Sequence, residues 1–259
     1  MIEVHNLTFG YSATEDGQIL KGVDFAAKTG KLTALIGTNG AGKSTLLKTI
    51  MGILKGKGEI SVNGKPVSQY STKDFSSTVS YLSQDNDCRV NLTVFEVVML
   101  GRMGSMSFRV SDEDIAATQE VLERLNLQRF ASRSIMELSG GQRQLVFMAQ
   151  ALVKEPKILI LDEPTSALDL HKQFDLLTLL KNLTQENDFT TLVTLHHLDL
   201  AAMFADEIIV LKEGRVYAQG APKDIFTEAM MEDVYRVKTK IYIDDNGLPH
   251  VIPLEAIIN

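Results

Sequence analysis

The stretch "GTNGAGKST" at residues 37–45 constrains this chain more than any other segment. It matches G-x-x-x-x-G-K-[ST], follows the buried run "LTALI" and opens the helical stretch "STLLKTIMG", the strand–loop–helix setting that this phosphate-binding motif needs. The glycines let backbone N–H groups face phosphate oxygens, while the lysine serves the terminal phosphate and the next hydroxyl serves Mg²⁺. We therefore expect an α/β nucleotide-binding fold. The predicted nucleotide contacts are Gly37, Asn39, Gly40, Ala41, Gly42, Lys43, Ser44 and Thr45, of which Ser44 is also a predicted Mg²⁺ ligand.

Composition narrows the setting in which such a fold would work. The 259 residues carry a formal net charge of −7 without a run of lysines and arginines, so we expect neither nucleic acid nor an anionic membrane surface as the main partner. The single cysteine, Cys88, excludes an intrachain disulfide and fits a reducing compartment. No run approaches the roughly 18 apolar residues of a membrane span, and we expect any work at a membrane to occur by docking onto another chain.

Changes of hydrophobic period along the chain predict its organisation. Alternating or buried apolar runs predict strands at 2–9, 23–28, 32–37, 59–64, 79–83, 157–161, 190–195 and 207–220, the last with a tight turn at Glu213-Gly214. Three-to-four spacing predicts helices at 93–102, 111–126, 139–155, 170–187 and 197–205; Ser111 and Asp114 form a capping-box pattern. Strands alternating with helices indicate a parallel sheet covered on both faces. We expect an α/β core, a small antiparallel sheet built mostly by N-terminal strands, and an inserted helical subdomain.

Two acids end the predicted buried strand in "ILILDEP" at residues 158–164. Ligands bind at the carboxyl ends of parallel strands, so we expect Asp162 beside Ser44 and the metal, with Glu163 one step nearer the γ-phosphate. Asp162 would stay ionised in the Mg²⁺ shell, whereas Glu163 is free to orient or deprotonate the attacking water. By itself, an acid pair after a strand is as often a charge at a helix N-terminus as a catalytic pair. The assignment therefore depends on the motif at 37–45.

Polar side chains after two other strands complete the candidate site. Gln84 in "YLSQD" is placed to reach both Mg²⁺ and water at the edge of the helical insertion, although alone it would be read as a solvated loop residue. His196 in "VTLHHLDLA" is assigned to the γ-phosphate, and His197 begins the next helix with its side chain turned elsewhere. A single strand-end histidine is usually structural, so this assignment also rests on its neighbours.

A second phosphate-type helix start occurs about a hundred residues after the first. "ELSGGQRQL" at residues 137–145 places a serine and two glycines before a helical pattern, where orphan N–H groups and the helix dipole favour an anion. A mononucleotide enzyme needs only one such cradle. The second one therefore requires a separate explanation.

This set of motifs, taken in order, resembles the ATPase subunit of ATP-binding cassette (ABC) transporters over essentially the whole chain. The family's motifs match Tyr11 (stacking on adenine), 37–45, Gln84, the signature "LSGGQ" at 138–142, Asp162 with the catalytic Glu163, "SALD" at 166–169 and His196. The resemblance implies a RecA-like P-loop NTPase core at 1–84 and 157–259 and a helical signature subdomain at 85–156. It also implies ATP and Mg²⁺ as ligands, with Ser44, Gln84 and Asp162 holding the metal.

The family mechanism also explains the second helix start. Two copies associate head to tail, so that ATP on one P-loop meets Ser139, Gly140, Gly141 and Gln142 of the other copy, across a C2 interface. The γ-phosphate favours the closed dimer and its release lets the pair open. Asp169 would report between the two sites, and Gln84 would pass the motion to a membrane partner. The implied complex holds two integral-membrane permease subunits at the cytoplasmic face of the membrane, and indirectly a substrate-binding protein.

A finer resemblance points to importers of iron–siderophore, haem or cobalamin, on the segments "LTVFEVVMLGRM", 195–226 and "VYRVKTKIYIDDNGLPHVIPL". Two departures stand out: His197 occupies a position that is usually aspartate, and "SATEDGQI" lengthens the loop after Tyr11. A soluble ABC ATPase, such as an iron–sulfur cluster assembly scaffold, is the alternative, and co-purification with membrane subunits separates the two. A P-loop kinase or GTPase would leave "LSGGQ" without a purpose.

Overall fold

The computed structural model describes residues 1–12, 17–84, 91–102 and 110–258. Cys88 and residues 13–16 of the lengthened loop after Tyr11 lie outside the described residues. The chain forms two compact units, the first made of residues 1–69 and 180–259 and the second of residues 70–179. The helical segment expected at 85–156 falls within the second unit, and the finer boundaries at 84 and 157 stay a prediction.

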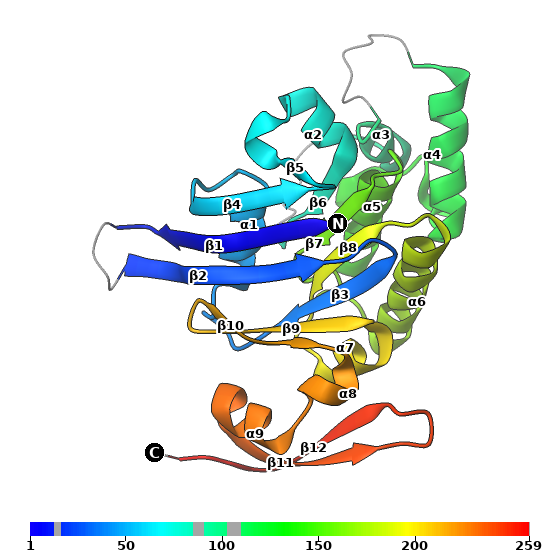
Figure 1. The fold of residues 1–259 in the computed structure, drawn as a ribbon. Coiled ribbons are helices and arrows are strands. Elements are labelled where there is room, and N and C mark those ends of the chain that lie inside the picture. The colour runs from blue at the N-terminus through cyan, green and yellow to red at the C-terminus, as the bar shows by residue number, and fades with distance from the viewer. Residues whose placement is uncertain (13–16, 85–90, 103–109, 259) are drawn as a thin grey trace. The chain divides into compact units, whose positions relative to one another are not determined.

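An antiparallel sheet opens the first unit, as the N-terminal pattern predicted. Its strands are β1 (Ile2–Gly10), β2 (Gln18–Ala27), β4 (Lys57–Val62) and β5 (Lys65–Pro66), in the order β2-β1-β4-β5, and they run from blue to cyan in Figure 1. Ile2 pairs with Ala27 and with Val62, and all three side chains are buried. Strand β2 begins five residues earlier than predicted. Leu20 is buried but lies three residues before Val23, where the pairing with β1 shifts register, so the alternation read from Val23 onward did not extend to it.

Parallel strands carry the phosphate-binding motif in the same unit. Strand β3 (Lys31–Ile36) pairs in parallel with β8 (Thr190–Thr194) and β9 (Glu207–Lys212). Strand β10 (Arg215–Gly220) returns antiparallel to β9 through the predicted turn, where Glu213 and Gly214 have φ of 49° and 78°. Helix α1 (Lys43–Ile50) follows β3 and α7 (Leu198–Phe204) follows β8. The apolar runs of β3 and β8 are almost wholly buried, as expected for a parallel sheet.

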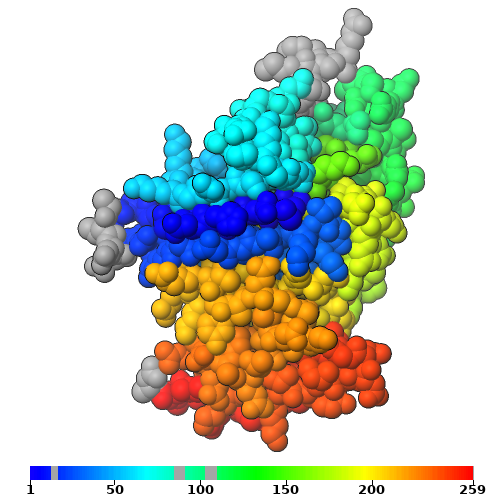
Figure 2. All heavy atoms as spheres, viewed as in Figure 1, coloured from blue at the N-terminus to red at the C-terminus, as the bar shows by residue number. Residues whose placement is uncertain are grey.

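The C-terminal segment forms structure that the sequence did not predict. Two short helices, α8 (Pro222–Ile225) and α9 (Glu228–Met230), lead into the π-helical turn η5 (Met231–Tyr235). A hairpin of β11 (Val237–Ile243) and β12 (Pro249–Ala256) follows, and β12 packs against α7. In Figure 2 this hairpin lies at the surface in orange to red, consistent with the exposure of Tyr242, Ile252 and Leu254.

The second unit combines two parallel strands with helices. Strand β6 (Val79–Leu82) pairs in parallel with β7 (Ile158–Leu161), and α2 (Thr72–Thr78) directly precedes β6. The predicted helices form α3 (Val94–Met99), α4 (Asp112–Arg124) and α5 (Gly140–Leu152), which pack on one another, and α6 (Leu170–Glu186) begins in this unit. Helices α3, α4 and α5 each begin with a capping box, which satisfies orphan donors of the first turn. The unpredicted elements are α2 and the 3₁₀ turns η3 (Gln128–Phe130) and η4 (Ile135–Glu137).

None of the helices in the described part of the chain combines the length and the apolar character that a bilayer span requires.

Candidate functional site

The loop between β3 and α1 has the curled backbone that the glycines predicted. Gly37, Gly40 and Gly42 have φ of 148°, 81° and 104°, a region that favours glycine. A Cβ at Gly37 would lie 2.2 Å from the Leu211 carbonyl oxygen, so no other residue fits there. Helix α1 has no side-chain cap, which leaves N–H groups of its first turn for an anion.

The Lys43 side chain is buried within this loop. Its Nζ donates to the carbonyl oxygens of Gly37 at 2.8 Å and Thr38 at 3.0 Å. A phosphate group cradled by the loop would compete for this ammonium group, because a charged acceptor forms the stronger hydrogen bond. The ammonium group of Lys43 is thus held at the phosphate-binding loop by two backbone carbonyls.

Tyr235 contacts the same loop, and local sequence patterns did not reveal it. Its phenol lies at the end of the π-helical turn η5 and forms a hydrogen bond with the Gly37 backbone. Burial raises the pKa of the phenol, and the bond to Gly37 partly offsets this rise. Tyr235 is therefore a neutral group that supports the first residue of the phosphate-binding loop from the C-terminal segment.

Gln84 and Glu163, which follow two different predicted strands, form a hydrogen bond in the second unit, next to Asp162. Asp162 follows β7 and is only 1% exposed, and its N–H donates to the Leu82 oxygen at 2.9 Å, which joins the ends of β7 and β6. Glu163 has a φ of 52°, a left-handed conformation uncommon outside glycine. Gln84 donates from Nε2 to the Glu163 Oε2 at 2.8 Å. This bond orients the carboxylate that is the predicted general base.

The start of α5 presents residues 139–142 at the surface. Ser139 caps the helix: its Oγ accepts from the Gln142 N–H at 3.3 Å, and its own N–H donates to the Gln142 Oε1 at 2.9 Å. A Cβ at Gly140 would meet nothing within 4 Å, whereas one at Gly141 would lie 2.8 Å from the Ala167 oxygen. Gly141 thus permits close packing of the helix start on the loop at 166–169.

That loop ends at Asp169, whose carboxylate binds the next helix. The Lys172 N–H donates to Asp169 Oδ1 at 3.0 Å and the Lys172 Nζ lies 2.9 Å from Oδ2. These contacts lower the pKa of Asp169, chiefly through the backbone N–H. Asp169 therefore remains charged at neutral pH.

Tyr11, His196 and His197 lie at exposed positions of the first unit, whereas Ser44 and Thr45 in the first turn of α1 are half-buried. His196 and His197 follow β8 with exposed side chains, and His197 is the N-cap residue of α7 without a side-chain cap bond. The Tyr11 ring is 71% exposed and meets Phe9 edge to face at 5.0 Å. Their contacts with a nucleotide stay predictions. The first unit contains Tyr11, residues 37–45 and His196. The second unit contains Gln84, residues 139–142, Asp162 and Glu163.

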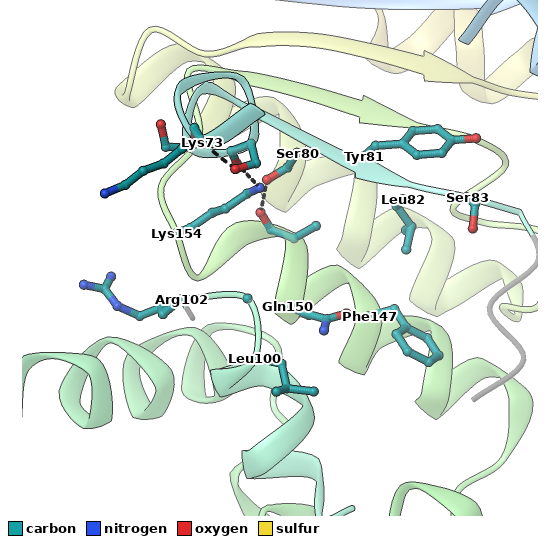
Figure 3. A pocket seen from close by; sticks show the side chains of 14 residues that line it. Lys73, Ser80, Tyr81, Leu82, Ser83, Leu100, Arg102, Phe147, Gln150 and Lys154 are labelled. Atoms are coloured by element: carbon teal, nitrogen blue, oxygen red, sulfur yellow. Dashed lines mark hydrogen bonds between the residues drawn. The ribbon is translucent and has the colours of Figure 1, made fainter. Parts of the chain in front are cut away.

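A groove of about 420 Å³ lies in the second unit, lined by α2, β6, α5 and residues 100–102 (Figure 3). Lys154 lines it and donates to the carbonyl oxygens of Ser76 and Val79, and burial lowers the pKa of its ammonium group. Arg102 lines it too, 2.7 Å from Asp114. Ser83 at its margin directly precedes Gln84, whose side chain bonds Glu163.

Comparison with known proteins agrees with this geometry. Residues 20–166 match the family described as "ABC transporter". The chain is 37% identical over 246 residues to the iron(3+)-hydroxamate import ATP-binding protein FhuC of Bacillus subtilis (strain 168), covering 94% of this chain and 90% of FhuC. It is 36% identical over 253 residues to the ferric enterobactin transport ATP-binding protein FepC of Escherichia coli (strain K12), covering 96% of this chain and 92% of FepC. A dimeric structure of the ATP-binding cassette MJ0796, in a post-hydrolysis state with ADP and Pi, superposes with a TM-score of 0.77 at 30% identity, covering 86% of this chain and 99% of that one.

Proposed function

Because this chain belongs to the ABC transporter family and is an ATPase of that family, we propose that it powers a membrane importer for iron–siderophore complexes, haem or cobalamin. One observation supports the importer assignment most strongly: similarity to one import and one transport ATP-binding protein extends over at least 90% of each chain compared. Both relatives are named for iron carriers, which favours a siderophore over haem or cobalamin as the cargo.

In this proposal the residues of the chain divide the work of hydrolysis. Lys43 leaves the carbonyl oxygens of Gly37 and Thr38 for the γ-phosphate of ATP. Glu163, oriented by Gln84, accepts a proton from the attacking water or aligns it. His196 donates to the γ-phosphate. Each group acts by position and charge, as phosphoryl transfer requires.

The donor set fits Mg²⁺, which takes oxygen ligands and is usually held by one or two carboxylates together with phosphates and water. The proposed protein ligands, Ser44, Gln84 and Asp162, offer a hydroxyl, an amide and a carboxylate oxygen. Among the described residues no group of three or more His, Cys, Asp or Glu forms a metal site of its own. When bound, the ion would neutralise charge on the phosphates.

We propose a head-to-tail dimer as the catalytic unit. The start of α5 supports it, because Ser139 is exposed there and a helix N-terminus favours an anion, so that the Ser139 Oγ and the Gly141 N–H would meet a γ-phosphate held by a second copy. The dimeric form of the MJ0796 cassette supports it as well. The Asp169 loop, which packs on Gly141, would sense the partner copy.

The groove of Figure 3 is the proposed seat for a permease subunit. A permease segment inserted there would reach Ser83 and so influence Gln84, which orients Glu163. Two permease subunits would place the ATPase dimer at the cytoplasmic face of the membrane as a peripheral component, with a substrate-binding protein acting only through the permease.

Glu163→Gln tests the hydrolytic part of the proposal. The amide keeps the shape and can still bond Gln84, but it cannot take a proton, so we expect turnover to fall by about 10²- to 10⁴-fold. ATP binding should stay within about two-fold of the wild type, since the change removes no phosphate ligand. Size-exclusion chromatography with ATP should show the variant accumulating as a dimer. Undiminished turnover would remove Glu163 from this role.

Co-purification tests the transport part. Tagged full-length chain expressed in its own cells and extracted in mild detergent should bring down membrane-embedded subunits. Lys73→Glu and Arg102→Glu, both lining the groove, should reduce this yield, and Lys48→Glu, whose residue lies outside it, is the control. Recovery without membrane subunits would instead favour a soluble role.

A further inference from the structure

A second cavity lies in the second unit, away from the groove of Figure 3. It has a volume of about 260 Å³ and is bordered by the end of α4, the turn η3 and the first turns of α6. Its floor is apolar, because Leu125, Leu127, Phe130 and Leu176 line it and are at most 9% exposed. Such a floor suits a ligand with an apolar body.

The rim of this cavity is basic on a chain whose net charge is −7. Arg124, Arg129 and Lys172 line it, and Asp175 is the single acid among the described lining residues. Arg124 is 2.7 Å from Glu120 and Lys172 is 2.9 Å from Asp169. Exposed ion pairs of this kind contribute little stability, so both cations can turn toward a competing anion at low cost.

Arg129 differs from these two cations. Within the described part of the chain it has no carboxylate partner, and its guanidinium lies 4.7 Å from the centre of the Phe130 ring. Stacking on an aromatic face leaves the edge of a guanidinium open for a bidentate acceptor such as a carboxylate, sulfonate or phosphate. Arg129 therefore sets a positive charge at the edge of an apolar floor.

We propose that this cavity is a binding site for a small organic anion: one acidic group held by Arg129, with Lys172 or Arg124 as second partner, on an apolar ring body that rests on Phe130 and the leucines. Its volume lies just below the range of roughly 300–1,000 Å³ for drug-sized ligands, which limits the occupant to about two fused rings. Gln142 also lines the cavity, so the ligand would touch the side chain that closes the capping box of α5.

The binding test uses 6-fluoronaphthalene-2-carboxylate as the probe, followed by ¹⁹F NMR titration of the full chain with excess MgADP to fill the nucleotide site. We expect saturable binding with a Kd of about 0.1–1 mM, in keeping with a fragment of this size. The neutral analogue 6-fluoronaphthalene-2-methanol should bind at least about ten-fold more weakly, since it lacks the charge that Arg129 recognises.

Two neighbouring arginines provide a matched control. Arg133 also lies over the Phe130 ring, at 5.3 Å, but it does not line the cavity. We expect Arg129→Gln to weaken carboxylate binding at least about five-fold and Arg133→Gln to leave it within about two-fold. Leu179→Trp, at a half-buried lining position, should fill the cavity and abolish binding of both probes.

Two results would overturn the proposal: the wild-type chain failing to saturate with the carboxylate by about 10 mM, or the two arginine variants losing affinity equally. Either result stands apart from the proposed transport function, because the titration measures neither hydrolysis nor a permease.

Discussion

His196 and His197 are adjacent and both exposed, yet only His196 is assigned to the γ-phosphate. We expect His196→Ala to lower turnover at least about 100-fold, as loss of a donor to a transition-state oxygen does, and His197→Ala to change it less than about two-fold. Steady-state ATPase assays of the two variants measure the difference. The opposite ranking would transfer the role to His197.

Other residues of the site differ in how far the sequence revealed them. Glu163 and Gln84 each follow a predicted strand, and their proximity follows from the parallel pairing of β6 with β7. The left-handed backbone of Glu163 could not be predicted, because no glycine or asparagine marks it. Tyr235 was missed for a different reason. It reaches Gly37 from about two hundred residues away along the chain, and no local pattern reports such a contact.

Among the elements, helix α4 has one carboxylate, Asp114, that joins its N-cap residue to Arg102. Asp114 binds Arg102 and the N–H and hydroxyl of Ser111, and these contacts lower its pKa to about 2 from a usual 3.8. Because the pKa of Asp114 is lower in the folded chain than in the unfolded chain, the ionised carboxylate stabilises the folded state. This contribution is complete above about pH 4 and is lost as the pH falls toward 2.

Asp114→Asn should therefore lower Tm at pH 6 and flatten the acid limb of the Tm–pH curve between about pH 4 and 2. Differential scanning fluorimetry across pH 2–7 measures this. Asp112→Asn, which removes a charge from the same turn but leaves the Arg102 contact intact, should keep the limb. Parallel curves for the wild type and Asp114→Asn would disprove the linkage.

The two glycines at the start of α5 are predicted to differ in tolerance. Gly141→Ala places a methyl group 2.8 Å from the Ala167 oxygen and should destabilise by about 1–3 kcal/mol. Gly140→Ala meets nothing within 4 Å and should be neutral or stabilising by up to about 1 kcal/mol, because alanine favours the helix. Urea denaturation measures the free energy of unfolding of the two variants. Equal losses of this free energy would show that Gly141 is not packed as described.

Helices that combine a capping pair with an apolar stripe were predictable from the sequence. The capping pairs Ser111 with Asp114 and Ser139 with Gln142 mark α4 and α5. Helix α2 has the same signal, Ser71 with Asp74, but its polar, half-exposed residues lack an apolar stripe. The β11–β12 hairpin does carry a turn signal, Asn246-Gly247, where Gly247 has a φ of 79°, and this signal could have predicted the hairpin. The π-helical turn has no comparable pattern, and α7 packs against β12.

For the whole molecule, the proposed dimer predicts complementation between two inactive chains. A Lys43→Ala chain lacks the phosphate-binding lysine and a Ser139→Arg chain has a blocked signature, so each alone should show almost no turnover. Mixed one to one, they form heterodimers in which one composite site joins an intact loop to an intact signature. The ATPase activity of the mixture should exceed the sum of the activities of the two chains measured separately. Strict additivity would mean that each chain completes its own site.

The exposed start of α5 also has a genetic consequence. If Ser139 serves the partner copy, a cell that makes normal and Ser139-defective chains in equal amounts leaves only about a quarter of its dimers wholly normal under random pairing. Mixed dimers keep one intact composite site of two, so such an allele would be partly dominant, and its severity would grow with its expression relative to the normal gene. A defect that merely unfolded the chain would be recessive, since an unfolded chain enters no dimer.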